Sequence, residues 1–117
     1  MHGDLRADNV LLTPSGAVIV DWPAACRGSA LLDLALLAPS VAMQGGPTPR
    51  ELLARTTAGR GAEIEVLTPL VCAFAGYLTE RSLQPPPPGL PTLRAFQAAQ
   101  AVEAVRWLAE LLPLPGG

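Results

Sequence analysis

The start of this chain gathers side chains that could do chemistry. The stretch HGDLRADN, residues 2–9, holds one histidine, two aspartates, one arginine and one asparagine. Transfer of a phosphoryl group to an alcohol needs a carboxylate beside the attacking hydroxyl and hard oxygen ligands for Mg²⁺. Asp4 offers the carboxylate, and the amide oxygen of Asn9 offers one metal ligand. The stretch therefore holds two of the groups that such a transfer requires.

A second carboxylate, that of Asp21, comes at the end of a predicted β-hairpin, which would bring it back to this loop. Two short apolar runs with a Pro-Ser-Gly turn between them predict a β-hairpin, with strands over roughly residues 10–13 and 17–21. Asp21 ends the second strand, so we expect it to share one Mg²⁺ with Asn9, with Asp4 a few ångströms away. The spacing H-x-D-L-x-x-x-N, followed by an aspartate after a strand, matches the protein-kinase signature.

Other interpretations of these residues stay open. The stretch could be an ordinary polar loop before a hairpin, with Asp8 as a turn residue and His2 as a packing and hydrogen-bonding residue. A metal-dependent phosphoesterase that uses His2, Asp4 and Asp21 is a further alternative. The single histidine of the chain counts against it, because hydrolytic metal sites usually gather more histidines and carboxylates.

The remainder of the chain predicts helices, which gives an α+β, mostly α, fold: a loop and a β-hairpin followed by about four helices. Ser29 is a suitable N-cap, and Thr48-Pro49 resembles a cap followed by a first-turn proline. Pro39 is expected to kink or end the first helix, and Pro69 to kink or restart the third. The predicted helices cover residues 30–41, 50–55, 64–78 and 92–112.

Apolar residues at spacings of three and four assign a buried face to each of the two long helices. On the first of these helices the buried face comprises Ile64, Leu67, Val71, Phe74 and Leu78. On the last helix the buried face comprises Leu93, Phe96, Ala104, Leu108 and Leu111. Its predicted solvent-facing residues are Gln100, Glu103, Arg106 and Glu110.

Composition limits the class of protein. The 117 residues suffice for one domain, and 50% of them are hydrophobic against 15% charged. The net charge of −2 argues against a nucleic-acid partner, and no apolar run is long enough to span a membrane. Cys26 and Cys72 stand apart in apolar surroundings, so we expect buried free thiols of a reducing compartment, which indicates a cytoplasmic protein; the alternative is a disulfide or a metal pair.

Together, HGDLRADNVLL and the following VIVDW resemble the aminoglycoside phosphotransferase and choline kinase family, relatives of the protein kinases. The resemblance implies that Asp4 is the catalytic base and that Asn9 and Asp21 are the Mg²⁺ ligands. Many protein kinases carry a lysine near the transferred phosphoryl group where this chain has Arg6. Arg6 could serve in the same way, or it could be an exposed loop arginine.

The later stretch LLDLALL is similar to the next element of that family, a helix whose aspartate steadies the catalytic loop. The resemblance implies that Asp33 accepts hydrogen bonds from backbone N–H groups of residues 2–4, with His2 as a second supporting residue. The alternative for Asp33 is a solvent-facing helix position.

The resemblance also implies ATP and Mg²⁺ as cofactors and a small-molecule hydroxyl as the phosphate acceptor. In this family a nucleotide lobe with a glycine-rich loop and a lysine precedes the catalytic loop, whereas this chain has no lysine and no G-x-G-x-x-G. We therefore expect residues 1–117 to be a C-terminal lobe truncated at its N-terminus, inactive alone and able to self-associate through the surface that the missing lobe leaves exposed. The alternative is a non-catalytic helical interaction module derived from the family.

Overall fold

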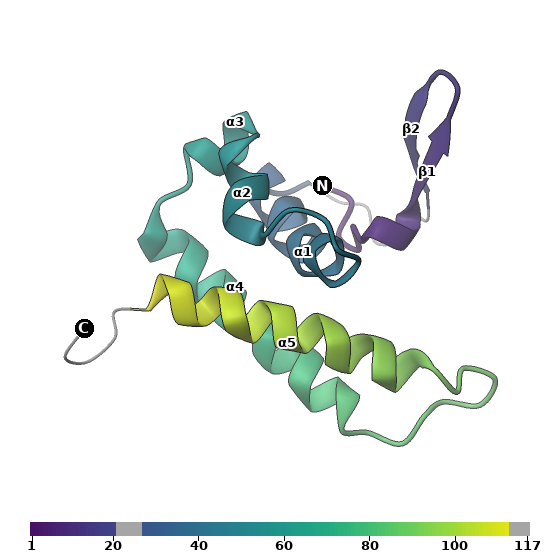
Figure 1. The fold of residues 1–117 in the computed structure, drawn as a ribbon. Helices are drawn as coiled ribbons and strands as arrows, with labels where there is room; N and C mark the ends of the chain where they lie inside the picture. The colour runs from purple at the N-terminus through teal and green to yellow at the C-terminus, as the bar shows by residue number, and fades with distance from the viewer. Residues whose placement is uncertain (21–26, 113–117) are drawn as a thin grey trace. The chain divides into compact units, whose positions relative to one another are not determined.

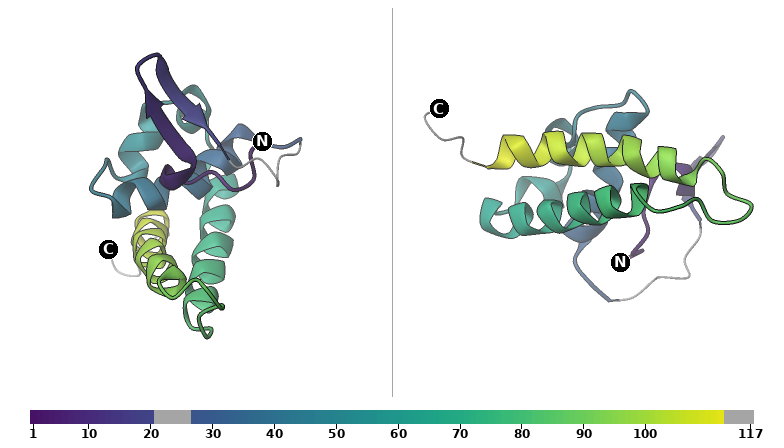
Figure 2. Two further views of the ribbon diagram at one scale, coloured as in Figure 1. Left: turned by 90° about the vertical axis from the view of Figure 1, so that its right-hand side faces the viewer. Right: turned by 90° about the horizontal axis from the view of Figure 1, so that it is seen from below.

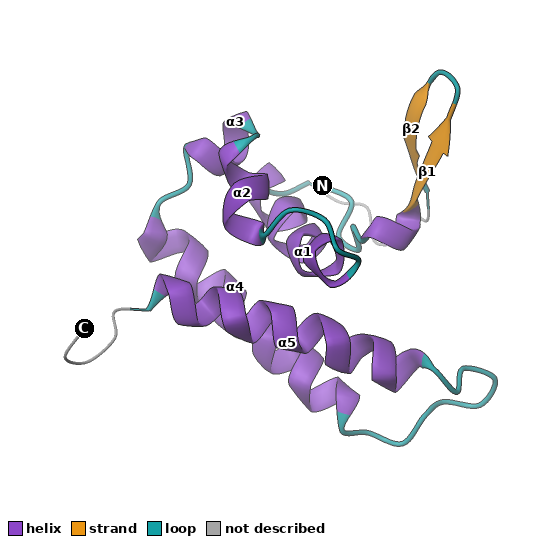
Figure 3. Ribbon diagram, viewed as in Figure 1, coloured by secondary structure: helices purple, strands orange, loops and turns teal. Residues whose placement is uncertain are grey.

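The computed structural model describes residues 1–20 and 27–112, and this part of the chain is mostly helical (Figure 1, Figure 3). It contains one two-stranded sheet and five α-helices, which confirms the predicted α+β, mostly α, class. The chain divides into two compact units, unit 1 over Met1–Gly61 and unit 2 over Ala62–Gly117. Among the described residues, no helix combines the length and the apolar character that crossing a membrane requires.

Unit 1 begins with the HGD loop, residues 2–9, which leads directly into the β-hairpin. The loop ends in a short 3₁₀ helix, η1 (Ala7–Asn9). Strand β1 (Val10–Thr13) then pairs antiparallel with strand β2 (Gly16–Ile19). The predicted hairpin is confirmed, and its second strand begins one residue earlier than the sequence pattern indicates.

The hairpin turns tightly and leaves apolar side chains in contact with solvent. The Thr13 hydroxyl donates to the Gly16 carbonyl at 2.8 Å, and Gly16 has a φ of 136°, in a region that favours glycine. The exposed apolar side chains of the strands are Leu11, Leu12, Val18 and Ile19. The hairpin therefore presents uncovered apolar surface.

Three helices complete unit 1: α1 (Ala30–Met43), α2 (Pro49–Ala54) and α3 (Thr57–Arg60). The side chains of Ser29 and Thr48 cap α1 and α2 by accepting backbone N–H groups at 3.1 and 3.2 Å, as predicted. The sequence pattern gave no sign of α3, which is a single turn. Helix α1 contacts η1, α2 and α3, so it is the central element of this unit.

Two prolines expected to kink their helices, or else to end or restart them, lie inside continuous helices. Helix α1 continues past Pro39, and in unit 2 helix α4 (Ile64–Ser82) contains Pro69 without a restart at Thr68. A proline removes one backbone hydrogen bond, but Pro39 is buried together with Ala38 and Ser40, and Pro69 lies between Leu67 and Val71, which are buried on one face of α4. Tertiary burial therefore maintains both helices despite the missing hydrogen bond.

Unit 2 is a helical hairpin in which α4 packs along α5 (Leu93–Leu111) (Figure 2). Its core consists mostly of alanines, which allow close contact between the two helices. The members are Ala75, Leu78, Ala101 and Ala104, with Phe74 partly buried against them. Leu67 and Val71 are also buried, as the apolar period of α4 predicts.

Two predictions about the helix faces of unit 2 are wrong. Gln100 is 2% exposed rather than solvent-facing, because it lies one turn before Ala104 on the buried side of α5. Trp107 is buried on the same side, one turn after Ala104. Ile64 is 60% exposed because it is the first residue of α4, where the helix has only just begun.

The prediction of a buried thiol at Cys72 is also wrong. Cys72 is free and exposed, because it follows Val71 in the helix and so points away from the side on which Val71 and Ala75 are buried. Cys26 lies outside the described residues.

Replacing Ala104 with leucine should destabilise the helical hairpin. Ala104 is 0% exposed within the alanine-rich core, so a larger side chain fits only if its neighbours move. We expect the free energy of unfolding, measured by urea denaturation, to fall by about 1–3 kcal/mol. The control Ala109→Leu, at an exposed position of the same helix, should change it by less than about 0.5 kcal/mol. Equal stability of the two variants would contradict the close packing of this core.

Candidate active site

The HGD loop is held by the side chain of Asp33, in the first turn of α1. The Oδ2 atom of Asp33 accepts the backbone N–H of His2 at 2.6 Å, and Oδ1 accepts that of Gly3 at 2.9 Å. Gly3 has a φ of 85°, in the left-handed region that glycine enters without steric cost. The hydrogen bonds predicted for Asp33 are therefore present, and α1 fixes the start of the loop.

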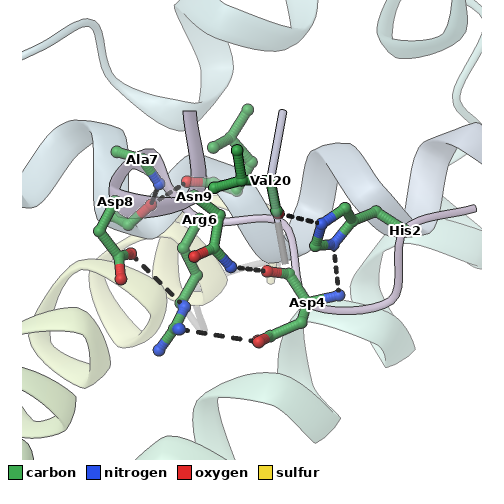
Figure 4. A network of polar contacts seen from close by, with 9 residues as sticks. His2, Asp4, Arg6, Ala7, Asp8, Asn9 and Val20 are labelled. Carbon is green, nitrogen blue, oxygen red and sulfur yellow. Dashed lines mark hydrogen bonds and ion pairs between the residues drawn. The ribbon is translucent and has the colours of Figure 1, made fainter. Parts of the chain in front are cut away.

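The ring of His2 joins the loop to the end of the hairpin (Figure 4). Its Nε2 lies 2.8 Å from the carbonyl oxygen of Val20, and its Nδ1 accepts the backbone N–H of Asp4 at 3.1 Å. Because Nδ1 acts as the acceptor, the neutral ring carries its hydrogen on Nε2 and donates it to Val20. His2 is 2% exposed, so it connects two parts of the site from a buried position.

Asn9 is buried at the end of η1, and the loop itself orients its carboxamide. The Nδ2 atom donates to the backbone carbonyl of Asp4 at 2.8 Å. The backbone carbonyl of Asn9 accepts the N–H of Val20, also at 2.8 Å. Because Nδ2 is engaged, the side-chain oxygen Oδ1 is the group of Asn9 that remains to bind an external partner.

Three charged side chains of the loop, those of Asp4, Arg6 and Asp8, form two ion pairs (Figure 4). The Nη2 atom of Arg6 lies 3.6 Å from Oδ2 of Asp4, and its Nε lies 3.5 Å from Oδ1 of Asp8. The Asp4 and Asp8 side chains are 48% and 44% exposed, so solvent screens both ion pairs. Within the described residues, Nε of Arg6 is buried and has no hydrogen-bond partner. The guanidinium therefore lies between the carboxylates of Asp4 and Asp8, and its Nε faces Asp8 in an ion pair without a hydrogen bond.

The second predicted Mg²⁺ ligand, Asp21, lies outside the described residues. Over residues 1–20 and 27–112, no group of three or more His, Cys, Asp or Glu side chains could hold a metal ion. The described part of the site supplies the amide oxygen of Asn9 and the carboxylate of Asp4. The sharing of one ion by Asn9 and Asp21 stays a prediction.

A residue that the sequence analysis missed, Ser40, also binds the loop. Its hydroxyl accepts the backbone N–H of Ala7 at 2.9 Å and donates to the carbonyl of Leu37 at 2.8 Å. Ser40 is 0% exposed and lies about two helical turns after Asp33 in α1. That spacing is the sequence signal that could have revealed it, because residues two turns apart share one face of a helix.

Replacing Asp33 with alanine should loosen the HGD loop. The N–H groups of His2 and Gly3 would lose their acceptor, and an unpaired donor in a buried position is costly. We expect the free energy of unfolding of unit 1 to fall by about 1–3 kcal/mol in chemical denaturation. Asp8→Ala is the control, because it removes an exposed aspartate of the same loop and should change stability by less than about 0.5 kcal/mol. Equal effects of the two substitutions would show that the Asp33 contacts contribute little.

Comparison with known proteins agrees with the geometry of the loop. The sequence profile of the phosphotransferase enzyme family, APH, matches residues 1–70, which is more than half of the chain and includes the HGD loop, the hairpin and α1. No curated protein sequence and no solved structure matches the chain significantly. On the strength of the profile match, this chain belongs to the phosphotransferase enzyme family.

Proposed function

We propose that this chain carries the transfer site of an ATP-dependent phosphotransferase that acts on a hydroxyl group of a small molecule. The HGD loop carries the proposal: hydrogen bonds from α1 hold its backbone, while the Asp4 carboxylate stays about half exposed. An ordered loop with an accessible carboxylate suits a reaction in which positioning and charge stabilisation supply most of the acceleration. Membership of the phosphotransferase family supports this reaction class.

Asp4 is the proposed catalytic base. Its N–H is bonded to His2 and its carbonyl to Asn9, so its main chain is fixed on both sides while its carboxylate reaches solvent. The carboxylate accepts the proton of the attacking hydroxyl. Arg6 places a positive charge 3.6 Å from this carboxylate, where it stabilises the negative charge of the transferred phosphoryl group.

The residues present fit a Mg²⁺ ion, which prefers oxygen ligands. The Oδ1 atom of Asn9 is suited to the role because Nδ2 is held by the Asp4 carbonyl. The backbone hydrogen bond between Asn9 and Val20 supports the proposal that Asp21, the next residue, is the second ligand. A bound ion neutralises charge on the phosphates of ATP.

We propose that ATP binding needs residues in addition to Asp4, Arg6, Asn9 and Asp21. The protein-kinase signature uses a lysine to pair with the α- and β-phosphates of ATP, and all eight basic residues of this chain are arginines. The uncovered apolar side chains of the hairpin, among them Leu11 and Leu12, suit contact with a further part of an enzyme. We therefore propose that residues 1–117 act as the C-terminal lobe and that a nucleotide lobe supplies the ATP site.

Mg²⁺ should raise the melting temperature of the chain. At about five times the dissociation constant, a bound ion adds about 1 kcal/mol of stability, or about 4–8 °C for a domain of this size. Scanning calorimetry with Mg²⁺ and then with excess EDTA measures the difference. The gain should disappear in Asp21→Asn and persist in Glu51→Gln, an exposed carboxylate of α2. A wild-type chain with no gain would favour a non-catalytic interaction module.

Phosphoryl transfer should require both this chain and a nucleotide lobe. Residues 1–117 alone should transfer no measurable labelled phosphate from ATP to an aminoglycoside or another hydroxylated small molecule, because the chain has no lysine to hold the phosphates of the nucleotide. Fusion of a nucleotide lobe of the family ahead of Met1 should restore transfer. In that fusion, Asp4→Asn should lower the rate at least about 100-fold while ATP binding persists, since Asp4 faces the acceptor. Turnover that Asp4→Asn leaves unchanged would contradict the assignment of the base.

A further inference from the structure

We infer that Ser40 is a positioning residue of this site: its buried hydroxyl caps η1 from helix α1 and thereby fixes the carboxamide of Asn9. The inference rests on the proposed function, in which Oδ1 of Asn9 is a Mg²⁺ ligand. It assigns a role to a side chain 33 residues away in sequence from the loop residue that it binds.

The N-terminus of η1 has no cap from its own sequence neighbourhood. The residue at the N-cap position is Arg6, whose side chain makes no capping hydrogen bond and has no acceptor atom. The N–H of Ala7, the first residue of η1, has no acceptor within the helix, and it donates to Oγ of Ser40 at 2.9 Å. Ser40 therefore supplies from α1 the acceptor that a serine at an N-cap ordinarily supplies from the adjoining residue.

The Ser40 hydroxyl is oriented for this role. Its single hydrogen is donated to the Leu37 carbonyl at 2.8 Å, which leaves its lone pairs for the Ala7 N–H. The two hydrogen bonds run in one direction, from Ala7 through Ser40 to Leu37, so each polarises the other. Because Ser40 is 0% exposed, an alanine at this position would leave the Ala7 N–H facing a methyl group.

The orientation of η1 determines that of Asn9. The helix is a single turn, closed by the Asn9 N–H, which donates to the carbonyl of Arg6 at 2.9 Å. The contact between Ser40 and Ala7 anchors this turn to α1, while Asp33 anchors the start of the loop to the same helix. With both ends held, the carboxamide of Asn9 is placed to donate to the Asp4 carbonyl and to present Oδ1.

Nuclear magnetic resonance of the chain tests the inference without turnover. In Ser40→Ala we expect hydrogen exchange of the Ala7 amide to be about tenfold faster than in the wild type. The side-chain amide resonances of Asn9 should also shift. Titration with MgCl₂, followed on the same resonances, should give an affinity about tenfold weaker.

Two further variants separate the loop contact from the general effect of removing a serine from a helix. Ser82→Ala is the matched control. The Ser82 hydroxyl donates to the Thr79 carbonyl at 2.7 Å, just as the Ser40 hydroxyl donates to the Leu37 carbonyl, so each serine bonds the residue three positions before it. It should leave the Ala7 exchange, the Asn9 resonances and the Mg²⁺ affinity unchanged. Ser40→Thr keeps the hydroxyl and should keep the Ala7 amide protected, and thermal melts establish that each variant folds.

Three results of the exchange and resonance measurements would overturn the inference: unchanged Ala7 exchange in Ser40→Ala, equal loss of protection in Ser40→Ala and Ser40→Thr, or faster exchange with unchanged Asn9 resonances. An unchanged Mg²⁺ affinity in Ser40→Ala would overturn it as well. A wild-type chain that does not respond to Mg²⁺ would instead refute the metal site of the proposed function. In that case the Asn9 resonances of Ser40→Ala still decide whether Ser40 positions that side chain.

Discussion

The carboxylate of Asp33 is the contact on which the HGD loop depends. Its two oxygens accept consecutive backbone N–H groups, those of His2 and Gly3. Because His2 is buried, loss of the carboxylate would remove an acceptor from its N–H in a place where such a loss is costly. Once the backbone at His2 is fixed, its ring can bond both the Val20 carbonyl and the Asp4 N–H. Helix α1 therefore places the loop, and the loop places the end of the hairpin.

In the loop, backbone N–H groups are hydrogen-bonded, whereas the charged side chains are partly exposed to solvent. The N–H groups of Gly3, Asp4 and Ala7 are bonded to side chains of the same unit. The ionised groups of Asp4 and Arg6 meet only at 3.6 Å and stay partly exposed. A main chain held in this way needs no contribution from the charged side chains, so those side chains remain available for a ligand.

Local signals in the sequence predicted most of this architecture, and the misses are positions in the helical period and one contact distant in sequence. The hairpin and the caps of α1 and α2 follow from turn and capping chemistry within a few residues. Gln100 and Cys72 were misassigned because residue polarity was weighted above position in the helical period. Asp33 could be anticipated from a motif, whereas the sequence signal for Ser40 is only its place two turns after Asp33, because its bond depends on how α1 lies against η1.

The long reach of the contacts from α1 has a consequence for the order of folding. Asp33 and Ser40 bind the loop across 30 to 33 residues, whereas the hairpin closes over one tight turn. Closing a longer segment costs more chain entropy, so α1 and the hairpin can form before the loop docks. Substitution of Asp33 should then accelerate unfolding more than it slows folding in stopped-flow measurements, as is typical of contacts absent from the transition state. On this basis we expect the segment that bears the chemistry to become ordered after α1 and the hairpin and to open before them.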